Sequence, residues 1–145
     1  MYTRKQIALL FLVTAAVSQS AHRVRRDGAM HYPRLIRAEL PLYPPLAWTA
    51  HIGGTVSIQV RVEKGSVVDA QIKSGNSLWL STPALANVRS WQFDPGDHAE
   101  FLVSYVYQIE GTQTPLPENP KVELDLPCLV KITARPFKPT TDAEH

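Results

Sequence analysis

Hydrophobic and polar residues alternate most regularly in the middle of the chain. Residues 55–63 place four β-branched residues, Val56, Ile58, Val60 and Val62, on one face and polar residues on the other. A strict period of two is typical of a strand with one buried face. Residues 67–73 repeat the alternation, and the intervening Lys64-Gly65 is typical of a tight turn. This pattern predicts a β-hairpin whose second strand points Val68, Ala70 and Ile72 inward.

The next segment changes from a period of two to helical spacing. Ser81 or Thr82 predicts the N-cap of a helix that continues to Ser90, with a proline in its first turn. An apolar stripe recurs at spacings of three and four and is expected to face the sheet: Ala84, Leu85, Val88 and Trp91. Earlier in the chain, Tyr43-Pro44-Pro45 is expected to open a short packing helix.

A second alternating segment, residues 99–109, predicts another strand. One of its sides carries Phe101, Val103, Tyr105, Tyr107 and Ile109. The other side is unusually apolar for a solvent face and carries Glu100, Leu102, Ser104, Val106 and Gln108. A proline-rich stretch then leads to a last candidate strand at residues 128–135. Together these elements predict an α+β fold, a small antiparallel sheet with two helices on one face and an extra C-terminal strand.

The first 21 residues are expected to form an export signal. Arg4-Lys5 precede an apolar run at residues 7–17, and small residues follow through Ala21. The run is shorter than the about 20 residues that a membrane-spanning helix needs, so cleavage is expected and an uncleaved anchor is the alternative. The chain then divides into the signal (1–21), an N-terminal arm (22–39), a domain (40–110) and a Pro-rich segment with the extra strand and a tail (111–145).

Composition narrows the class of protein. The chain has 145 residues, of which 44% are hydrophobic and 19% charged, and this suits one folded domain. Its net charge of +2 belongs to the export signal, because removing residues 1–20 leaves 13 basic and 13 acidic residues. A neutral domain without a clustered basic surface is not expected to bind nucleic acid. The lone Cys128 excludes an intrachain disulfide and a cysteine zinc site, and we expect a buried thiol.

No motif for catalysis or cofactor binding stands out in the sequence. The five histidines are scattered and form no i,i+4 pair. A Gly-x-Ser-x-Gly elbow, a Walker loop and a Gly-x-Gly-x-x-Gly motif are all absent. Four titratable residues cluster around one turn, which we interpret as a solvated turn rather than a cation site: Asp94, Asp97, His98 and Glu100. We therefore expect no catalytic residues, metal or cofactor, and no enzymatic activity.

Several motifs, taken in order, resemble the C-terminal domain of TonB. They are Tyr43-Pro44-x-x-Ala47, Gly54-Thr55-Val56, the hairpin after it, and Val88-x-x-Trp91-x-Phe93-x-Pro95. The resemblance covers residues 40–110 and implies a compact αββαβ periplasmic domain. It also implies a structural role for the motif residues, namely Tyr43, Pro44, Ala47, Gly54, Val88, Trp91, Phe93 and Pro95.

The resemblance further implies a partner. TonB is an energy transducer in transmembrane transport, and its domain contacts an outer-membrane receptor whose short extended box adds a strand to the sheet. An edge strand offers unpaired N–H and C=O groups for such β-augmentation. We expect the partner-binding edge to be strand 99–109, at Glu100, Leu102, Ser104, Val106 and Gln108.

Two interpretations of this edge stay open. In the first, the chain is a periplasmic module that docks a transporter segment, or an inner-membrane-anchored one if the N-terminal segment is uncleaved. In the second, the C-terminal strand covers the edge, and the domain is a structural or interaction domain that dimerises or caps itself without energy coupling. Residues 22–40 contain a single proline, Pro33, and so form no rigid spacer, which favours a stand-alone exported domain.

Overall fold

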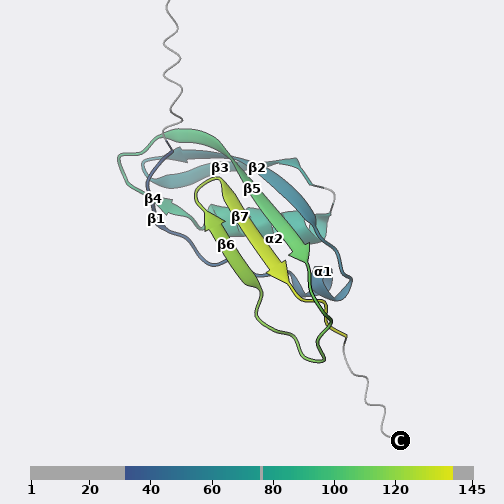
Figure 1. The fold of residues 1–145 in the computed structure, drawn as a ribbon. Helices are drawn as coiled ribbons and strands as arrows, with labels where there is room; N and C mark the ends of the chain where they lie inside the picture. The colour runs from purple at the N-terminus through teal and green to yellow at the C-terminus, as the bar shows by residue number, and fades with distance from the viewer. Residues whose placement is uncertain (1–31, 76, 139–145) are drawn as a thin grey trace, which may run out of the picture. The chain divides into compact units, whose positions relative to one another are not determined.

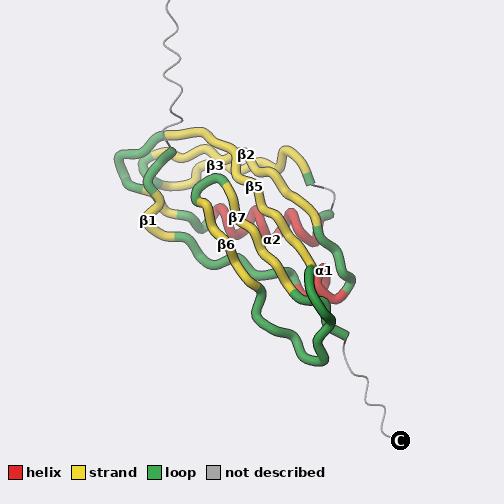
Figure 2. Tube along the Cα trace, viewed as in Figure 1, coloured by secondary structure: helices red, strands yellow, loops and turns green. Residues whose placement is uncertain are grey.

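The fold is described from a computed structural model, whose described residues are 32–75 and 77–138. These residues form an α+β fold with one seven-stranded sheet and two helices (Figure 1 and Figure 2). The strands are β1 (Leu35–Arg37), β2 (Gly54–Glu63), β3 (Ser66–Ser74), β4 (Gln92–Phe93), β5 (Ala99–Ile109), β6 (Lys121–Asp125) and β7 (Leu129–Ala134). The helices are α1 (Pro45–Thr49) and α2 (Leu78–Arg89). The predicted export signal, most of the predicted arm and the end of the tail lie outside the described residues.

The sheet is mixed rather than antiparallel. Its strand order is β1-β4-β3-β2-β5-β7-β6. Strands β5 and β7 run parallel, whereas every other neighbouring pair of named strands is antiparallel. The predicted α+β class with a sheet and helices is confirmed, but the expected small, purely antiparallel sheet is wrong. The reason is that a long connection, which contains β6, follows β5. This connection brings the chain back so that β7 runs beside β5 in the same direction.

The predicted hairpin is confirmed as β2 and β3. Lys64 and Gly65 both have positive φ, 51° and 78°, as a two-residue turn between twisted strands requires. Gly65 is also packed tightly, because a Cβ atom there would lie 2.5 Å from the carbonyl oxygen of Phe93. The Phe93 N–H donates to the Gly65 carbonyl oxygen at 2.8 Å, so the turn holds β4 in place.

Helix α2 begins earlier than predicted. Its N-cap is Ser77 rather than Ser81 or Thr82. Ser81 is buried inside the helix, where its hydroxyl donates to the carbonyl oxygen of Ser77. The prediction was wrong because a proline was assigned to the first turn, whereas Pro83 lies inside the helix.

The core lies between the sheet and the two helices. Helix α2 packs against β2 and β3 and contacts α1, and both helices lie behind the strands in Figure 1. The residues predicted to point inward from β2 and β5 are buried except Ile109, which is partly buried; the buried ones are Val56, Ile58, Val60, Val62, Phe101, Val103, Tyr105 and Tyr107. This alternation confirms the predicted buried face of both strands.

A polar network fixes α2 to the sheet. The side-chain oxygen of Asn87 accepts hydrogen bonds from the Tyr105 hydroxyl at 2.7 Å and from the Trp91 indole N–H at 3.2 Å. The Asn87 amide nitrogen donates to the carbonyl oxygen of Glu39 at 2.9 Å. One side chain therefore joins the helix, strand β5 and the segment that precedes α1.

The C-terminal strand is part of the core. Val130, Ile132 and Ala134 of β7 are buried on the same face as Tyr105 and Tyr107. The chain after β7 is held by α1, because the Trp48 indole N–H donates to the Arg135 carbonyl oxygen at 2.6 Å and the Trp48 ring contacts the Phe137 ring. Cys128, just before β7, is a half-buried free thiol.

Candidate partner-binding site

The predicted partner-binding strand, β5, is interior to the sheet. It pairs with β2 on one side along its length and with β7 on the other side over residues 104–109. The prediction that Ser104, Val106 and Gln108 lie at a sheet edge is therefore wrong. The reason is that the C-terminal strand, which the minimal αββαβ arrangement lacks, occupies that side.

Backbone hydrogen bonds show how β5 and β7 are joined. The Ser104 N–H donates to the Cys128 carbonyl oxygen at 2.8 Å, and the Glu110 N–H donates to the Ala134 carbonyl oxygen at 2.9 Å. Successive peptide groups of a strand point to opposite sides, so the even-numbered residues of β5 direct their backbone groups toward β7. The side-chain oxygen of Gln108 is buried in this region and accepts no hydrogen bond from the described residues.

Two residues of the predicted site keep an unpaired side. Glu100 and Leu102 pair with Arg61 and Gln59 of β2, and no named strand of the described residues pairs with their other side. Leu102 is 46% exposed on the open face of the sheet. The remaining open edge of β5 is confined to this end of the strand, because β7 occupies the side from Ser104 onward.

The motif residues of the TonB-like segment are mostly in the core. Tyr43, Pro44, Ala47, Val88, Trp91 and Phe93 are buried. Gly54 opens β2 and is partly buried, and Pro95 is exposed in the turn that follows β4. Pro44 is the N-cap residue of α1, and the Tyr43 hydroxyl donates to the Ile52 carbonyl oxygen at 2.7 Å. These positions suit a structural role rather than direct contact with a partner.

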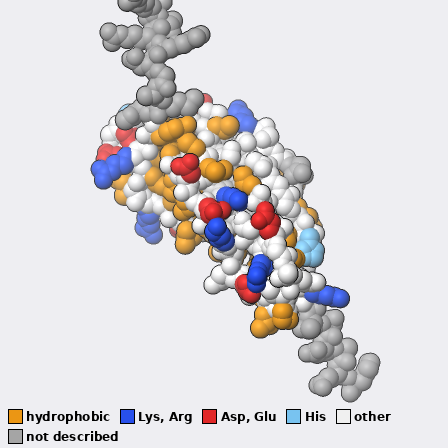
Figure 3. Space-filling model, viewed as in Figure 1, with side chains coloured by type: hydrophobic (Ala, Val, Ile, Leu, Met, Phe, Trp, Pro, Cys, Tyr) orange, Lys and Arg blue, Asp and Glu red, His pale blue; other side chains and the backbone are white. Residues whose placement is uncertain are grey.

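Strand β6 ends the sheet but is short and charged. Its open-face side chains include Lys121 and Glu123, which form an ion pair at 2.8 Å, and Lys131 of β7 lies 3.5 Å from the second oxygen of Glu123. Figure 3 shows basic and acidic side chains side by side over this part of the sheet. The hydrogen bond from Lys121 lowers the pKa of Glu123. Charged side chains on a short edge strand oppose pairing with other chains.

The longest unpaired side belongs to β3. Beyond its hairpin partner β2, β3 pairs only at Ser66, which lies opposite Gln92 of β4. We call residues 67–74, on the side away from β2, the β3 edge. Among the named strands of the described residues, none pairs with it.

The direction of the β3 peptide groups follows from the pairing across the sheet. The peptide groups of the even-numbered residues of β5 point toward β7, so those of its odd-numbered residues point toward β2. Two β2 partners of these odd-numbered residues, Ile58 and Val60, therefore point their peptide groups toward β5. Gln59 and Arg61 then face β3, opposite Gln71 and Asp69. The alternate residues of β3, Ala70 and Ile72, therefore direct their N–H and C=O groups outward.

The side chains of the β3 edge differ between its two faces. Ile72, opposite Ile58, is 39% exposed, and Val68, at a register shift, is 48% exposed, although the sequence predicted both to point inward. Val67 rather than Val68 packs against the core. Val68 and Ile72 stay partly exposed because, among the described residues, β4 lies beside β3 at Ser66 and no named strand lies beside residues 67–74. On the open face, Gln71 donates to Asp69 at 3.0 Å and Lys73 donates to Gln71 at 3.5 Å, which forms a polar row.

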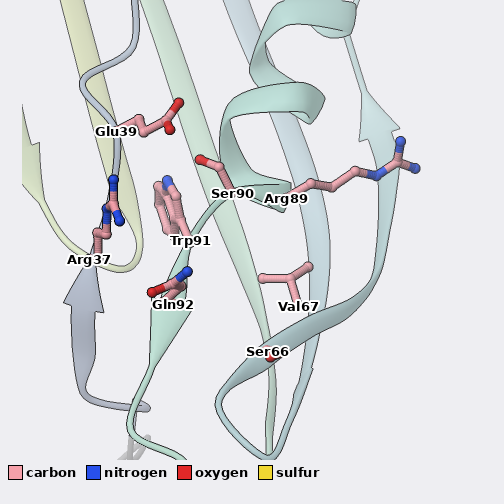
Figure 4. Close-up of a pocket in the computed structure, with 8 residues that line it drawn as sticks. All are labelled: Arg37, Glu39, Ser66, Val67, Arg89, Ser90, Trp91 and Gln92. Carbon is pink, nitrogen blue, oxygen red and sulfur yellow. The ribbon is translucent and has the colours of Figure 1, made fainter.

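A hollow lies along the first half of the β3 edge. It has a volume of about 330 Å³ and is lined by residues 67–70 together with Arg89 of α2. A neighbouring hollow of about 380 Å³ adjoins it at Val67 and Arg89 and extends to Trp91 and Gln92. Figure 4 shows Arg89 extending from the end of α2, away from Trp91. The space beside β3 is therefore open and bordered by the cationic side chain of Arg89, and Arg37 and Glu39 line the neighbouring hollow.

Sequence reasoning placed the binding edge on a strand that is mostly interior to the sheet. The hairpin pattern identified β3, but alternation alone does not show which side of a strand lacks a partner. A usable signal was available, because the segment after β3 predicts a helix instead of a third adjacent strand. A helix crossing the sheet leaves the outer side of β3 without a consecutive neighbour.

The titratable groups do not assemble into a reactive centre. Among the described residues, no group of three or more His, Cys, Asp or Glu side chains is arranged to hold a metal ion. In the turn that sequence reasoning singled out, Asp97 accepts a hydrogen bond from the Arg34 N–H at 2.7 Å, and Asp94 accepts one from the Gly96 N–H at 3.1 Å. These carboxylates therefore stabilise the loop that joins β4 to β5.

Comparison with known proteins adds no family assignment. A scan against protein-family models and a search of curated proteins both found no match to the chain. Among the described residues, no helix has the length and apolar character needed to cross a membrane.

Proposed function

We propose that the chain is an exported protein-binding module that takes an extended partner segment by β-strand addition at the β3 edge. The observation that carries this proposal is a nine-residue strand that, within the part of the chain that the structure describes, pairs beyond its hairpin only at Ser66. The outward peptide groups of Ala70 and Ile72 supply the hydrogen-bonding positions that an extended segment needs. The half-exposed Val68 and Ile72 side chains supply apolar contacts beside them.

The resemblance to the TonB C-terminal domain supports the proposed class of partner. Elements α1, β2, β3, α2 and β5 follow one another in the order that the resemblance implies, αββαβ, apart from the two-residue β4. On this basis the partner is an extended segment of an outer-membrane transporter, and the module works in the periplasm. Each backbone hydrogen bond contributes about 0.5–1.5 kcal/mol net, so the binding is expected to be reversible.

The pairing of β7 with β5 favours a second candidate function. In this reading the domain is an interaction domain that caps the β5 side with its own C-terminal strand and takes no part in energy coupling. The observation that favours it is the parallel ladder between residues 104–109 and 129–134. The two candidates differ in whether a transporter segment binds the domain at all.

Site-specific photo-crosslinking in the cell envelope tests the proposal. A photoreactive benzoylphenylalanine replaces Ile72 on the β3 edge, and the matched control carries it in place of Leu124 on β6, which has a similar exposure. The proposed function predicts a crosslink from position 72 to an outer-membrane transporter and none from position 124. The absence of any adduct from position 72 contradicts strand addition at β3, and adducts without a transporter support the second candidate.

A further inference from the structure

Two copies of the β3 edge, placed side by side in antiparallel orientation, bring oppositely charged residues opposite each other. Turning a second β3 by 180° about Gln71 places Asp69 of one copy opposite Lys73 of the other. The same operation places Ala70 opposite Ile72, and Gln71 opposite itself. We propose that the β3 edge binds the β3 edge of a second copy of this chain, antiparallel and centred on Gln71. This inference rests on the proposed strand addition at β3, because it names a partner for the same edge.

The backbone of β3 suits this register. Ala70 and Ile72 direct their peptide groups outward, because β2 pairs with β5 through its even-numbered residues and with β3 through its odd-numbered ones. In an antiparallel ladder, two opposed residues that both point toward the partner strand exchange a pair of hydrogen bonds. Centring on Gln71 opposes Ala70 to Ile72 twice, once on each side of the two-fold axis. Both outward residues in each copy are thereby satisfied.

The charged side chains gain ion pairs that they lack in one copy. Asp69 accepts from Gln71, and Lys73 donates to Gln71, but in the described part of the chain neither takes part in an ion pair. In the proposed dimer, Asp69 of each copy lies opposite Lys73 of the other copy. On β6, by contrast, Glu123 is already paired within one copy, with Lys121 at 2.8 Å and Lys131 at 3.5 Å. The unpaired charges of Asp69 and Lys73 therefore favour β3 over β6 as the dimer edge.

The apolar side chains of the edge also gain cover. Ile72 lies opposite Ala70 of the second copy on the core side of the sheet, so its exposed part is buried there. The β2–β3 register shifts on both sides of residues 69–72, so the regular hydrogen-bonded part of the dimer ladder is short and Lys73 reaches Asp69 from the end of that segment. We therefore expect a reversible dimer whose population rises with concentration, and whose formation hides the edge from other extended segments.

Sedimentation velocity over a concentration series tests the inference on the full exported chain. Asp69→Lys and Lys73→Asp are each expected to weaken self-association at least five-fold, because like charges then face each other across the axis. The double variant Asp69→Lys/Lys73→Asp restores the opposite-charge pairs and is expected to return association to within two-fold of the original chain. Asp125→Lys on β6 is the matched control, with the same charge change and no expected effect.

Three results would overturn the inference. They are a chain that stays monomeric at all concentrations, single variants that associate normally, and a double variant that stays as weak as the single ones. Circular dichroism confirms that each variant is folded, and Asp69→Asn and Lys73→Gln replace any variant that is not. A monomeric chain that still crosslinks from position 72 to a transporter would leave the proposed function standing while the dimer fails.

Discussion

Asn87 satisfies the polar atoms of two buried aromatic side chains at once. Its side-chain oxygen accepts from both the Tyr105 hydroxyl and the Trp91 indole N–H, and the two aromatic residues are at most 2% exposed. A buried donor without an acceptor costs about 1–3 kcal/mol. Asn87 therefore links α2 to two aromatic side chains of the core. A lone asparagine in a helical pattern gives little sign of this role in the sequence.

Replacing Asn87 by Leu is expected to lower the free energy of unfolding by about 2–4 kcal/mol, because two donors lose their shared acceptor. Urea denaturation of the variant measures the loss. The control is Tyr105→Phe, which removes one of the two donors. In the Asn87→Leu background, Tyr105→Phe should cost less than it does alone, and strictly additive losses would contradict the shared-acceptor interpretation.

At the scale of elements, strand β7 closes the β5 side of the sheet. Ile132 is fully buried opposite Tyr107, so β7 contributes to the core as well as to the hydrogen-bond ladder. Removal of β7 is therefore expected to destabilise the whole fold.

Ile132→Ala is expected to lower the free energy of unfolding by about 2–5 kcal/mol, since it leaves a cavity beneath the sheet. The matched control is Leu124→Ala on β6, where the side chain is 43% exposed and a loss below about 1 kcal/mol is expected. Thermal and urea unfolding of both variants provide the measurement. Equal losses at the two positions would show that β7 is not packed as described.

Local patterns predicted some elements well because those elements are determined locally. Alternation in residues 55–63 and 99–109 matched β2 and β5, and the Lys64-Gly65 turn matched the positive φ angles of the hairpin. Strand β4 was missed because its two residues are too few to show a period. Strand β6 was missed because proline-rich sequence surrounds its alternating residues.

Pairing between distant segments could not be predicted in the same way. The sequence of residues 129–134 does not show that they pair in parallel with residues 104–109. Their β-branched residues are typical of a strand, but they do not determine which strand is the partner or in which direction it runs. The assignment of the binding edge depended on this pairing. It was therefore the part of the candidate site that the sequence placed wrongly, while the core positions of the motif residues followed from their own apolar character.

At the scale of the whole molecule, three tyrosines make the fold sensitive to alkali. Burial raises the pKa of Tyr43 to about 12, and burial raises the pKa of Tyr105 and of Tyr107 further. The pKa of a tyrosine in the unfolded chain is about 10. The folded state therefore binds these protons more tightly, so its stability is complete below pH 10 and declines as pH rises from there.

Urea unfolding at pH 7, 9, 10 and 11 should show a plateau followed by a loss of at most about 1.4 kcal/mol per pH unit for each tyrosine involved. Tyr43→Phe removes the hydroxyl that donates to Ile52, so its stability at pH 7 should fall by about 1 kcal/mol. Its decline between pH 10 and 11 should be shallower than that of the original chain. An identical decline would exclude Tyr43 from the alkaline effect.

The parallel pairing of β5 with β7 also imposes an order on biogenesis. A polypeptide emerges from the ribosome N-terminus first, so β5 is complete before residues 129–134 exist. During that interval the even-numbered peptide groups of β5 have no partner, beside the apolar rings of Tyr105 and Tyr107. Unpaired strands of this kind recruit other chains. The nascent domain consequently carries an open edge on β5, which favours aggregation, until its last strand is made.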